Sequence, residues 1–167
     1  SPYQALLESI VYQQLTAKAA ATIYGRVCKS FGSSRCPGAE KVADAPDELL
    51  RAAGLSRSKV SAVKDLAQKS LDGEIPTRRA AEKLSDAALV ECLTNVRGVG
   101  TWTVEMFLIF TLGRPDVLPL DDYGVRKGFA RTFGRDVLPK PKELAALGEK
   151  WRPFRTAASW YLWRALE

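Results

Sequence analysis

The sequence of 167 residues contains no histidine, and this absence excludes a large part of enzyme chemistry. Nucleophilic mechanisms of the Ser-His and Cys-His kind need an imidazole base, and most histidine-based metal sites need its nitrogen atoms. Any catalysis by this chain must therefore use carboxylate, lysine, tyrosine or cysteine side chains.

Cysteine is also scarce. The chain has three, Cys28, Cys36 and Cys92, and their odd number and irregular spacing argue against a disulfide framework. The same spacing provides neither a zinc nor an iron–sulfur ligand set. We therefore expect a reducing, intracellular compartment.

Long apolar runs are missing. No uninterrupted apolar segment approaches the roughly 20 residues of a membrane span, and no signal peptide is visible.

The formal net charge of +6 is compatible with a nucleic-acid partner, but it is small enough to be incidental. A hydrophobic fraction of 46% suits one domain, or two closely packed lobes, with a sizeable core.

Strand-like alternation is absent, whereas helix signals recur along the chain. Ser1, Thr16, Ser56 and Ser85 each precede a segment with apolar residues at helical spacing, which is typical of N-caps. We predict an all-α protein with about eight to ten helices, in which residues 1–167 form a single domain.

The stretch from Leu93 to Arg131 carries the most information. Its turn VRGVG places Gly98 and Gly100 directly before an apolar helix predicted over Trp102 to Leu112. Glycine accepts positive φ and allows close backbone approach, and free N–H groups at a helix N-terminus favour a phosphate. The pattern fits a grip on a nucleic-acid backbone, although an ordinary tight turn between helices would look the same.

A pair of carboxylates follows this helix. Asp121 and Asp122 stand immediately before a helix predicted over Tyr123 to Phe133. Aspartate is a favoured N-cap, so Asp122 is either a cap or a catalytic carboxylate, and the two roles can coexist. We interpret Asp121 as a structural or capping residue.

Taken together, these segments resemble the helix-hairpin-helix DNA glycosylase superfamily. The resemblance rests on VRGVGTWTVEMF followed by LPLDDYGVRKGFAR, with support from the opening IVYQQLT and the closing WRPFRTAASWYLW. The most similar branch is the 3-methyladenine DNA glycosylase II type. The resemblance implies a two-lobed helical fold, with the hairpin at about residues 89–112 and an active-site cleft between the lobes. It also implies a monofunctional glycosylase of base excision repair that removes alkylated purines such as 3-methyladenine and 7-methylguanine.

The resemblance assigns roles around the damaged base. Asp122 matches the catalytic aspartate. Trp102 occupies the position at which bifunctional relatives carry a catalytic lysine, which implies that lyase activity is absent. Trp102 and Trp163 match aromatic residues of the base pocket. Met106 replaces a pocket tyrosine of one member, which leaves the lesion selectivity open.

The resemblance also assigns roles along the DNA. Gln14 matches the wedge that fills the gap left by a flipped nucleotide, and Gly98, Gly100 and Thr101 match phosphate contacts. A cation site, for Na⁺ or K⁺, is implied at three backbone carbonyls, those of Thr94, Val96 and Val99. No other cofactor is expected. The implied partner is double-stranded DNA with damaged bases, bound by a monomer in the cytoplasm or nucleoid of a prokaryote or in the nucleus of a eukaryote.

Several alternatives stay open. The lesion could instead be hypoxanthine, an etheno adduct or uracil, and the chain could be a non-catalytic DNA-binding module or a helical scaffold. Trp102 and Trp163 could be core aromatics, Met106 a core filler and Gln14 a solvated residue at a helix end. We interpret Trp151 and Trp160 as core residues. Five cations form either a plain solvated face or phosphate contacts: Lys59, Lys64, Arg126, Lys127 and Arg131.

Overall fold

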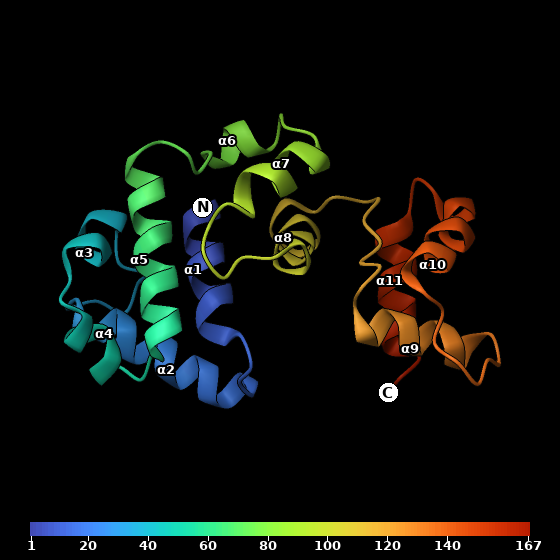
Figure 1. The fold of residues 1–167 in the computed structure, drawn as a ribbon, viewed down its shortest axis with the longest axis horizontal. Helices are drawn as coiled ribbons and strands as arrows, with labels where there is room; N and C mark the ends of the chain where they lie inside the picture. Colours follow the sequence, from blue (N-terminus) through green and yellow to red (C-terminus); the bar gives the residue numbers. More distant parts are fainter. The chain divides into compact units, whose positions relative to one another are not determined.

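The computed structural model describes residues 1–167 and confirms the all-helical prediction (Figure 1). The chain divides into two compact units, an amino-terminal unit over Ser1–Val104 and a carboxy-terminal unit over Glu105–Glu167. The helices of the amino-terminal unit are α1 Pro2–Tyr12, α2 Ala17–Ser30, α3 Ala39–Asp44, α4 Asp47–Ala52, α5 Arg57–Leu71, α6 Arg78–Ala81 and α7 Asp86–Leu93.

The unit boundary falls inside the next helix. Helix α8 spans Thr101–Phe107 and continues as a π-helical turn over Leu108–Leu112. The remaining elements are α9 Tyr123–Thr132, α10 Pro141–Gly148 with a 3₁₀ turn over Glu149–Trp151, and α11 Arg155–Arg164.

The predicted N-caps are confirmed. The side-chain oxygens of Ser1, Thr16, Ser56 and Ser85 accept hydrogen bonds from the backbone N–H three residues further on, at 3.1–3.3 Å. Each bond satisfies an N–H group that has no acceptor within its own helix. These caps explain why the starts of α1, α2, α5 and α7 were predictable.

The predicted number of helices was too low, because the structure has eleven α-helices. Helices α3 and α6 contain only six and four residues, so neither shows a full apolar period. The helix predicted over Trp102 to Leu112 changes from α to π geometry at Leu108, and Gly113 ends it with φ +68°.

Helix α5 is central to the amino-terminal unit. It packs against α1 and α3, as Figure 1 shows, and α1 also packs against α2. Leu6 and Ile10 of α1 and Leu66 of α5 are completely buried in this unit. Their burial contributes to the stability of this unit, because buried apolar side chains supply most of the favourable folding free energy.

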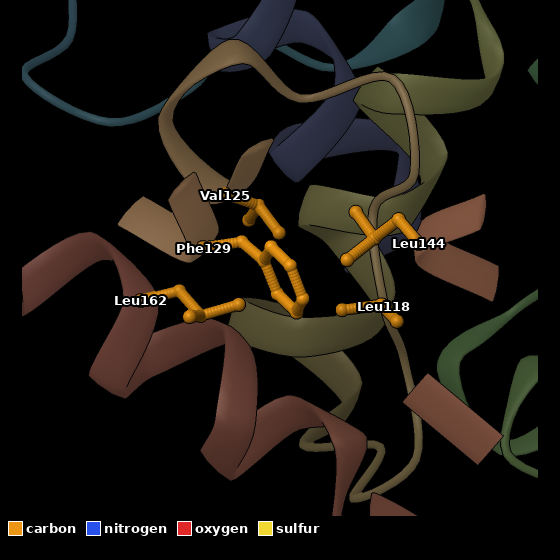
Figure 2. Packing of buried hydrophobic residues seen from close by; sticks show 5 residues of the cluster. All are labelled: Leu118, Val125, Phe129, Leu144 and Leu162. Atoms are coloured by element: carbon orange, nitrogen blue, oxygen red, sulfur yellow. The ribbon is translucent and has the colours of Figure 1, made fainter. Parts of the chain in front are cut away.

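The carboxy-terminal unit has its own core. Leu118, Val125, Phe129, Leu144 and Leu162 form one cluster (Figure 2), to which α9, α10 and α11 all contribute. Helices α9 and α11 pack very closely, because a Cβ atom at Gly128 would lie only 1.9 Å from the Leu162 carbonyl oxygen. Glycine at this position therefore determines how near the two helices approach.

Two expectations from the sequence concern the cysteines and the lengths of the helices. All three cysteines are free thiols, which confirms that no disulfide framework is present. None of the helices is both long and apolar enough to span a membrane.

Candidate active site

Asp122 lies at the N-terminus of α9 and is held by two donors. Its Oδ1 atom accepts a hydrogen bond from the backbone N–H of Val125 at 2.7 Å and another from Trp163 Nε1 at 2.8 Å. The N-cap is thus Asp122, and the capping role proposed as one option for Asp121 is wrong; the Asp121 side chain is exposed. Both donors fix the orientation of the carboxylate.

A second close approach brings Trp163 to this carboxylate. A Cβ atom at Gly124 would meet Trp163 Cδ1 at 2.9 Å and Asp122 Oδ1 at 3.1 Å. The glycines at positions 124 and 128 therefore create the space in which the α11 indole reaches the start of α9. Because the backbone of both helices is fixed by the core, the carboxylate is preorganised.

Trp163 also belongs to an aromatic cluster of the carboxy-terminal unit. Its ring stacks on Phe110, with centroids 6.0 Å apart, and Trp160 meets both rings edge-on. The prediction of a core role for Trp160 is wrong, because this residue is 49% exposed. Trp151 does pack partly buried against the core, as predicted.

Glu105 is a site residue that the sequence analysis missed. It lies in α8 and is half-buried, and the charges of Asp121 and Asp122 act on it. Burial, and then the repulsion from these two charges, raises the pKa of Glu105 from 4.5 to about 7. Its spacing of three residues from Trp102 was the available signal, since helical residues three apart share a face.

Hydrogen bonds and the backbone conformation of Gly98 fix the shape of the glycine turn. Val99 N–H donates to the Val96 carbonyl at 3.0 Å, and Arg97 N–H donates to Asp65 Oδ2 at 2.7 Å. Gly98 has φ +77°, and a Cβ there would press against Ala62 Cβ at 3.3 Å. Gly98 is thus required by the fold of the amino-terminal unit.

Gly100 differs from Gly98. Its φ is not in the left-handed region, and a Cβ there would meet nothing within 4 Å. Its carbonyl accepts the first bond of α8, from Val104 N–H at 3.2 Å, and Gly100 and Thr101 are both exposed. The absence of a side chain at Gly100 leaves the surface open to another backbone, as a phosphate contact requires.

Gln14 lies close to this turn within the same unit. It is exposed and has φ +57°, which is uncommon for a residue other than glycine. The neighbouring Gln13 donates from Nε2 to the Gly98 carbonyl at 2.9 Å, and Lys59 Nζ donates to the carbonyls of Val11 and Gln13 at 2.7 Å each. The position of Gln14 is therefore fixed by its neighbours.

The five cations have different environments. Lys59 is partly buried and its Nζ is bonded to two backbone carbonyls, which contradicts the prediction of a solvated or phosphate-binding side chain, and desolvation lowers its pKa. Lys64 bonds to the Ala45 carbonyl and to Asp47, and Arg126 Nε bonds to the Pro139 carbonyl at 2.9 Å. Lys127 and Arg131 are exposed on α9 and remain available for an anion.

The structure positions the predicted residues in two groups. Gln14 and the hairpin residues lie together in the amino-terminal unit, and Asp122 and Trp163 lie in contact in the carboxy-terminal unit. Trp102 is 47% exposed and Met106 is half-buried, so Trp102 is not a core aromatic. The predicted cleft between lobes and the predicted cation site stay predictions.

An all-helical fold with a glycine hairpin, followed by a helix that a fixed aspartate caps, defines the helix-hairpin-helix class of DNA-processing proteins. The chain belongs to the HhH-GPD superfamily of base excision DNA repair proteins, whose family model matches residues 7–153.

Individual relatives are similar over nearly the whole chain. DNA-3-methyladenine glycosylase 1 of Schizosaccharomyces pombe is 40% identical over 163 residues, which cover 98% of this chain and 72% of that protein. The solved structure of this fission-yeast enzyme in complex with abasic DNA superimposes with a TM-score of 0.86 and 41% identity, over 98% of this chain and 79% of that one. A DNA-3-methyladenine glycosidase from Bacillus halodurans gives a TM-score of 0.89 and 37% identity, over 99% and 75%.

Proposed function

We propose that this chain is a monofunctional DNA glycosylase that hydrolyses the N-glycosidic bond of flipped-out alkylated purines, such as 3-methyladenine and 7-methylguanine, in double-stranded DNA. The observation that carries the proposal is the Asp122 carboxylate, held by Val125 N–H and Trp163 Nε1. Relatives named for 3-methyladenine removal support the choice of substrate.

The reaction suits a single fixed carboxylate. Breaking the bond between C1′ and the base nitrogen develops positive charge on the sugar, and Asp122 stabilises that charge and orients the attacking water. A purine alkylated at N3 or N7 is already cationic and leaves readily. Such a base needs no second carboxyl as acid and no histidine, and the chain contains no histidine.

The aromatic residues recognise the cationic base in this proposal. Trp102 on α8 and Trp163 on α11 line the pocket with Met106, and an indole face attracts a desolvated cation by about 0.5–2 kcal/mol. Lyase chemistry requires an amine that attacks the sugar. Position 102 carries tryptophan, so the expected product is an intact abasic site.

The amino-terminal unit holds the DNA in this proposal. Gly98, Gly100 and Thr101 contact phosphates through backbone N–H groups, since the first N–H groups of a helix have no acceptor in that helix. Gln14 fills the space left by the flipped nucleotide, and its unusual backbone conformation is typical of functional positions. A damaged base lowers the cost of extrusion, which is a few kcal/mol.

The hairpin is also the proposed cation site. The carbonyls of Thr94, Val96 and Val99 are neutral oxygen ligands, which suit Na⁺ or K⁺ better than a transition metal. The Val96 carbonyl accepts one hydrogen bond, from Val99 N–H, and retains a second lone pair. Chelator treatment should leave base release unchanged. Replacing Na⁺ and K⁺ in the buffer by tetramethylammonium should weaken DNA binding. Equal affinity for DNA in the Na⁺ or K⁺ buffer and in the tetramethylammonium buffer would contradict the cation site.

The proposed protein acts as a monomer in the intracellular compartment that contains the DNA. Analytical ultracentrifugation of the chain, with and without a DNA duplex, would measure its oligomeric state. A dimer in either condition would contradict the proposal of a monomer.

The product analysis tests the proposed function. The chain is incubated with a duplex that contains methylated purines, and released bases are identified by mass spectrometry. We expect free methylated purines and strand breaks only after alkali. Strand breaks without alkali would contradict the monofunctional mechanism. Salt-dependent DNA binding without base release would show a binding module instead.

A further inference from the structure

The loop that leads to Asp122 lies along one face of α11. Thr156, Ser159 and Trp163 follow one another at the three- and four-residue spacing of a single helix face. Each of these side chains bonds to the segment that joins the π-helical turn to α9, residues 113–122. The face of α11 that holds the Asp122 carboxylate therefore also holds the loop before it.

Thr156 connects two backbone groups of this loop. Its hydroxyl donates to the Arg114 carbonyl at 2.6 Å, and its Oγ1 atom accepts a bond from Val117 N–H at 3.0 Å. The backbone N–H of Thr156 donates to the Pro115 carbonyl at 2.9 Å. Ser159, which is completely buried, adds a bond from its hydroxyl to the Val117 carbonyl at 3.2 Å. The middle of the loop is thus fixed mainly through Thr156.

An ion pair adds to the contact between the loop and α11. Asp116 Oδ1 accepts from Arg155 Nε at 2.7 Å, and Asp116 Oδ2 accepts from Arg152 Nη1 at 2.7 Å. Asp116 Oδ1 also accepts from the Arg155 backbone N–H at 3.4 Å, at the start of α11, where the N-cap residue Phe154 provides no side-chain bond. The carboxylate of the loop therefore satisfies a free N–H group and suits the positive end of the helix.

The length of the loop explains why these bonds matter for Asp122. Trp163 follows Thr156 by seven positions in α11, a rise of about 10 Å. The five residues after Val117, which end at Asp122, could reach about 17 Å if they were extended. A turn takes up part of the difference, since Asp122 N–H donates to the Pro119 carbonyl at 3.3 Å. A loop that is longer than the distance it spans can shift, so its anchor at Val117 limits where the carboxylate lies.

We propose that Thr156 is a positioning residue for base release, and that its hydroxyl, acting through the loop, keeps the Asp122 carboxylate where it stabilises the sugar. The inference rests on the proposed glycosylase function and extends it to a residue that acts through Asp122. The bonds of Thr156 lie in the carboxy-terminal unit, whereas the proposed DNA grip lies in the amino-terminal unit. Loss of the hydroxyl should therefore slow the reaction and leave DNA affinity unchanged.

The test separates the rate of base release from DNA affinity. Single-turnover release of 7-methylguanine from a duplex is measured over a range of protein concentrations, which gives a maximal rate constant and an apparent Kd. Thr156→Val keeps the shape of the side chain and removes the hydroxyl. It should lower the maximal rate about tenfold, with a Kd within about twofold of the wild type, because a displacement of about 1 Å can cost about 10²-fold.

Two further variants control this comparison. Thr156→Ser retains the hydroxyl and should keep the maximal rate within about threefold of the wild type. Thr132→Val is the same change on an exposed residue of α9 and should keep both wild-type values. If Thr156→Val does not stay folded at the assay temperature, Ser159→Ala, which removes one oxygen atom, takes its place with the same expected pattern.

A double substitution shows whether Thr156 acts through Asp122. In the Asp122→Asn background there is no charge to position, so adding Thr156→Val should cost less than about twofold. An equal loss in both backgrounds, a wild-type rate in Thr156→Val, or an equal loss in Thr156→Ser would overturn the positioning role and leave the proposed function standing. An effect confined to Kd would overturn it in the same way. No release of 7-methylguanine by the wild type would overturn the proposed function itself.

Discussion

The two units of the molecule present their functional groups in opposite ways. In the amino-terminal unit the hairpin offers backbone N–H groups, and Gly100 has open space where a side chain would stand. In the carboxy-terminal unit the important groups are side chains, and Asp122 meets Trp163 only because two helices approach within the space left by Gly124 and Gly128.

Glycine therefore has a different structural role in each unit. Gly100 in the hairpin leaves a surface accessible, so a change at this position should affect binding more than folding. Glycine in α9 allows close packing, so a change there should affect folding and the site together. The comparison thus assigns DNA binding to the amino-terminal unit and catalysis to the carboxy-terminal unit. Three substitutions test this division.

The largest effect is expected at Gly128. Gly128→Ala would place a methyl group 1.9 Å from the Leu162 carbonyl oxygen, so α9 and α11 must move apart. We expect a loss of about 3 kcal/mol in the free energy of unfolding, measured by urea denaturation, because overpacking of this kind costs about 1–3 kcal/mol or more. Gly25→Ala in α2, where a Cβ would meet nothing within 4 Å, is the control and should be neutral or stabilising. Equal stability of the two variants would contradict the close approach.

A smaller, pH-dependent effect is expected at Glu105. Its pKa is raised from 4.5 to about 7, so the folded chain binds the proton more tightly than the unfolded chain, and stability is lost as pH rises between these values. Glu105→Gln removes the buried charge and should raise the free energy of unfolding at pH 8 by about 1–2 kcal/mol, allowing for partial solvent screening, with little change at pH 4. Thermal melts at both pH values measure this difference. A variant destabilised at pH 8 would show that the carboxylate has a stabilising partner.

The smallest effect on folding is expected at Gly100. Gly100→Ala meets no neighbour and needs no change of φ, so its melting temperature should stay the same or rise slightly. The methyl group should hinder a phosphate and weaken duplex binding about threefold to tenfold, measured by fluorescence anisotropy at fixed salt concentration. Wild-type affinity would show that DNA does not approach this position.

The sequence predicted the helices whose starts carry a local signal. A cap residue and a full apolar period marked the starts of α1, α2, α5 and α7, and Asp122 was recognised as a possible cap of α9. Helices α3 and α6 have only six and four residues, so their sequences contain too little apolar spacing to predict a helix. The π geometry after Phe107 has no local sequence signal of comparable strength.

The site was only partly predictable, for a related reason. The resemblance to the glycosylase superfamily pointed to Asp122 and the hairpin, but the bond from Trp163 to Asp122 joins residues 41 apart and depends on helix packing. The same holds for Lys59, a lysine that appears solvated in the sequence but bonds to carbonyls 48 and 46 positions away. The spacing of Glu105 from Trp102 is a local signal, but the raised pKa of Glu105 depends on burial and on the charges of Asp121 and Asp122, which only the fold supplies.

The most direct test of the central claim is the single-turnover release of 7-methylguanine by Asp122→Asn. Asparagine is as good an N-cap as aspartate, so stability should change by less than about 0.5 kcal/mol. The negative charge is lost, and loss of one electrostatic group of this kind costs about 10²–10³-fold in rate. Asp136→Asn, on an exposed loop of the same unit, is the matched control.

We predict at least a hundredfold slower release by Asp122→Asn, with wild-type rates for Asp136→Asn and equal melting temperatures for all three proteins. Release by Asp122→Asn within a few-fold of the wild type would contradict the assignment of this carboxylate.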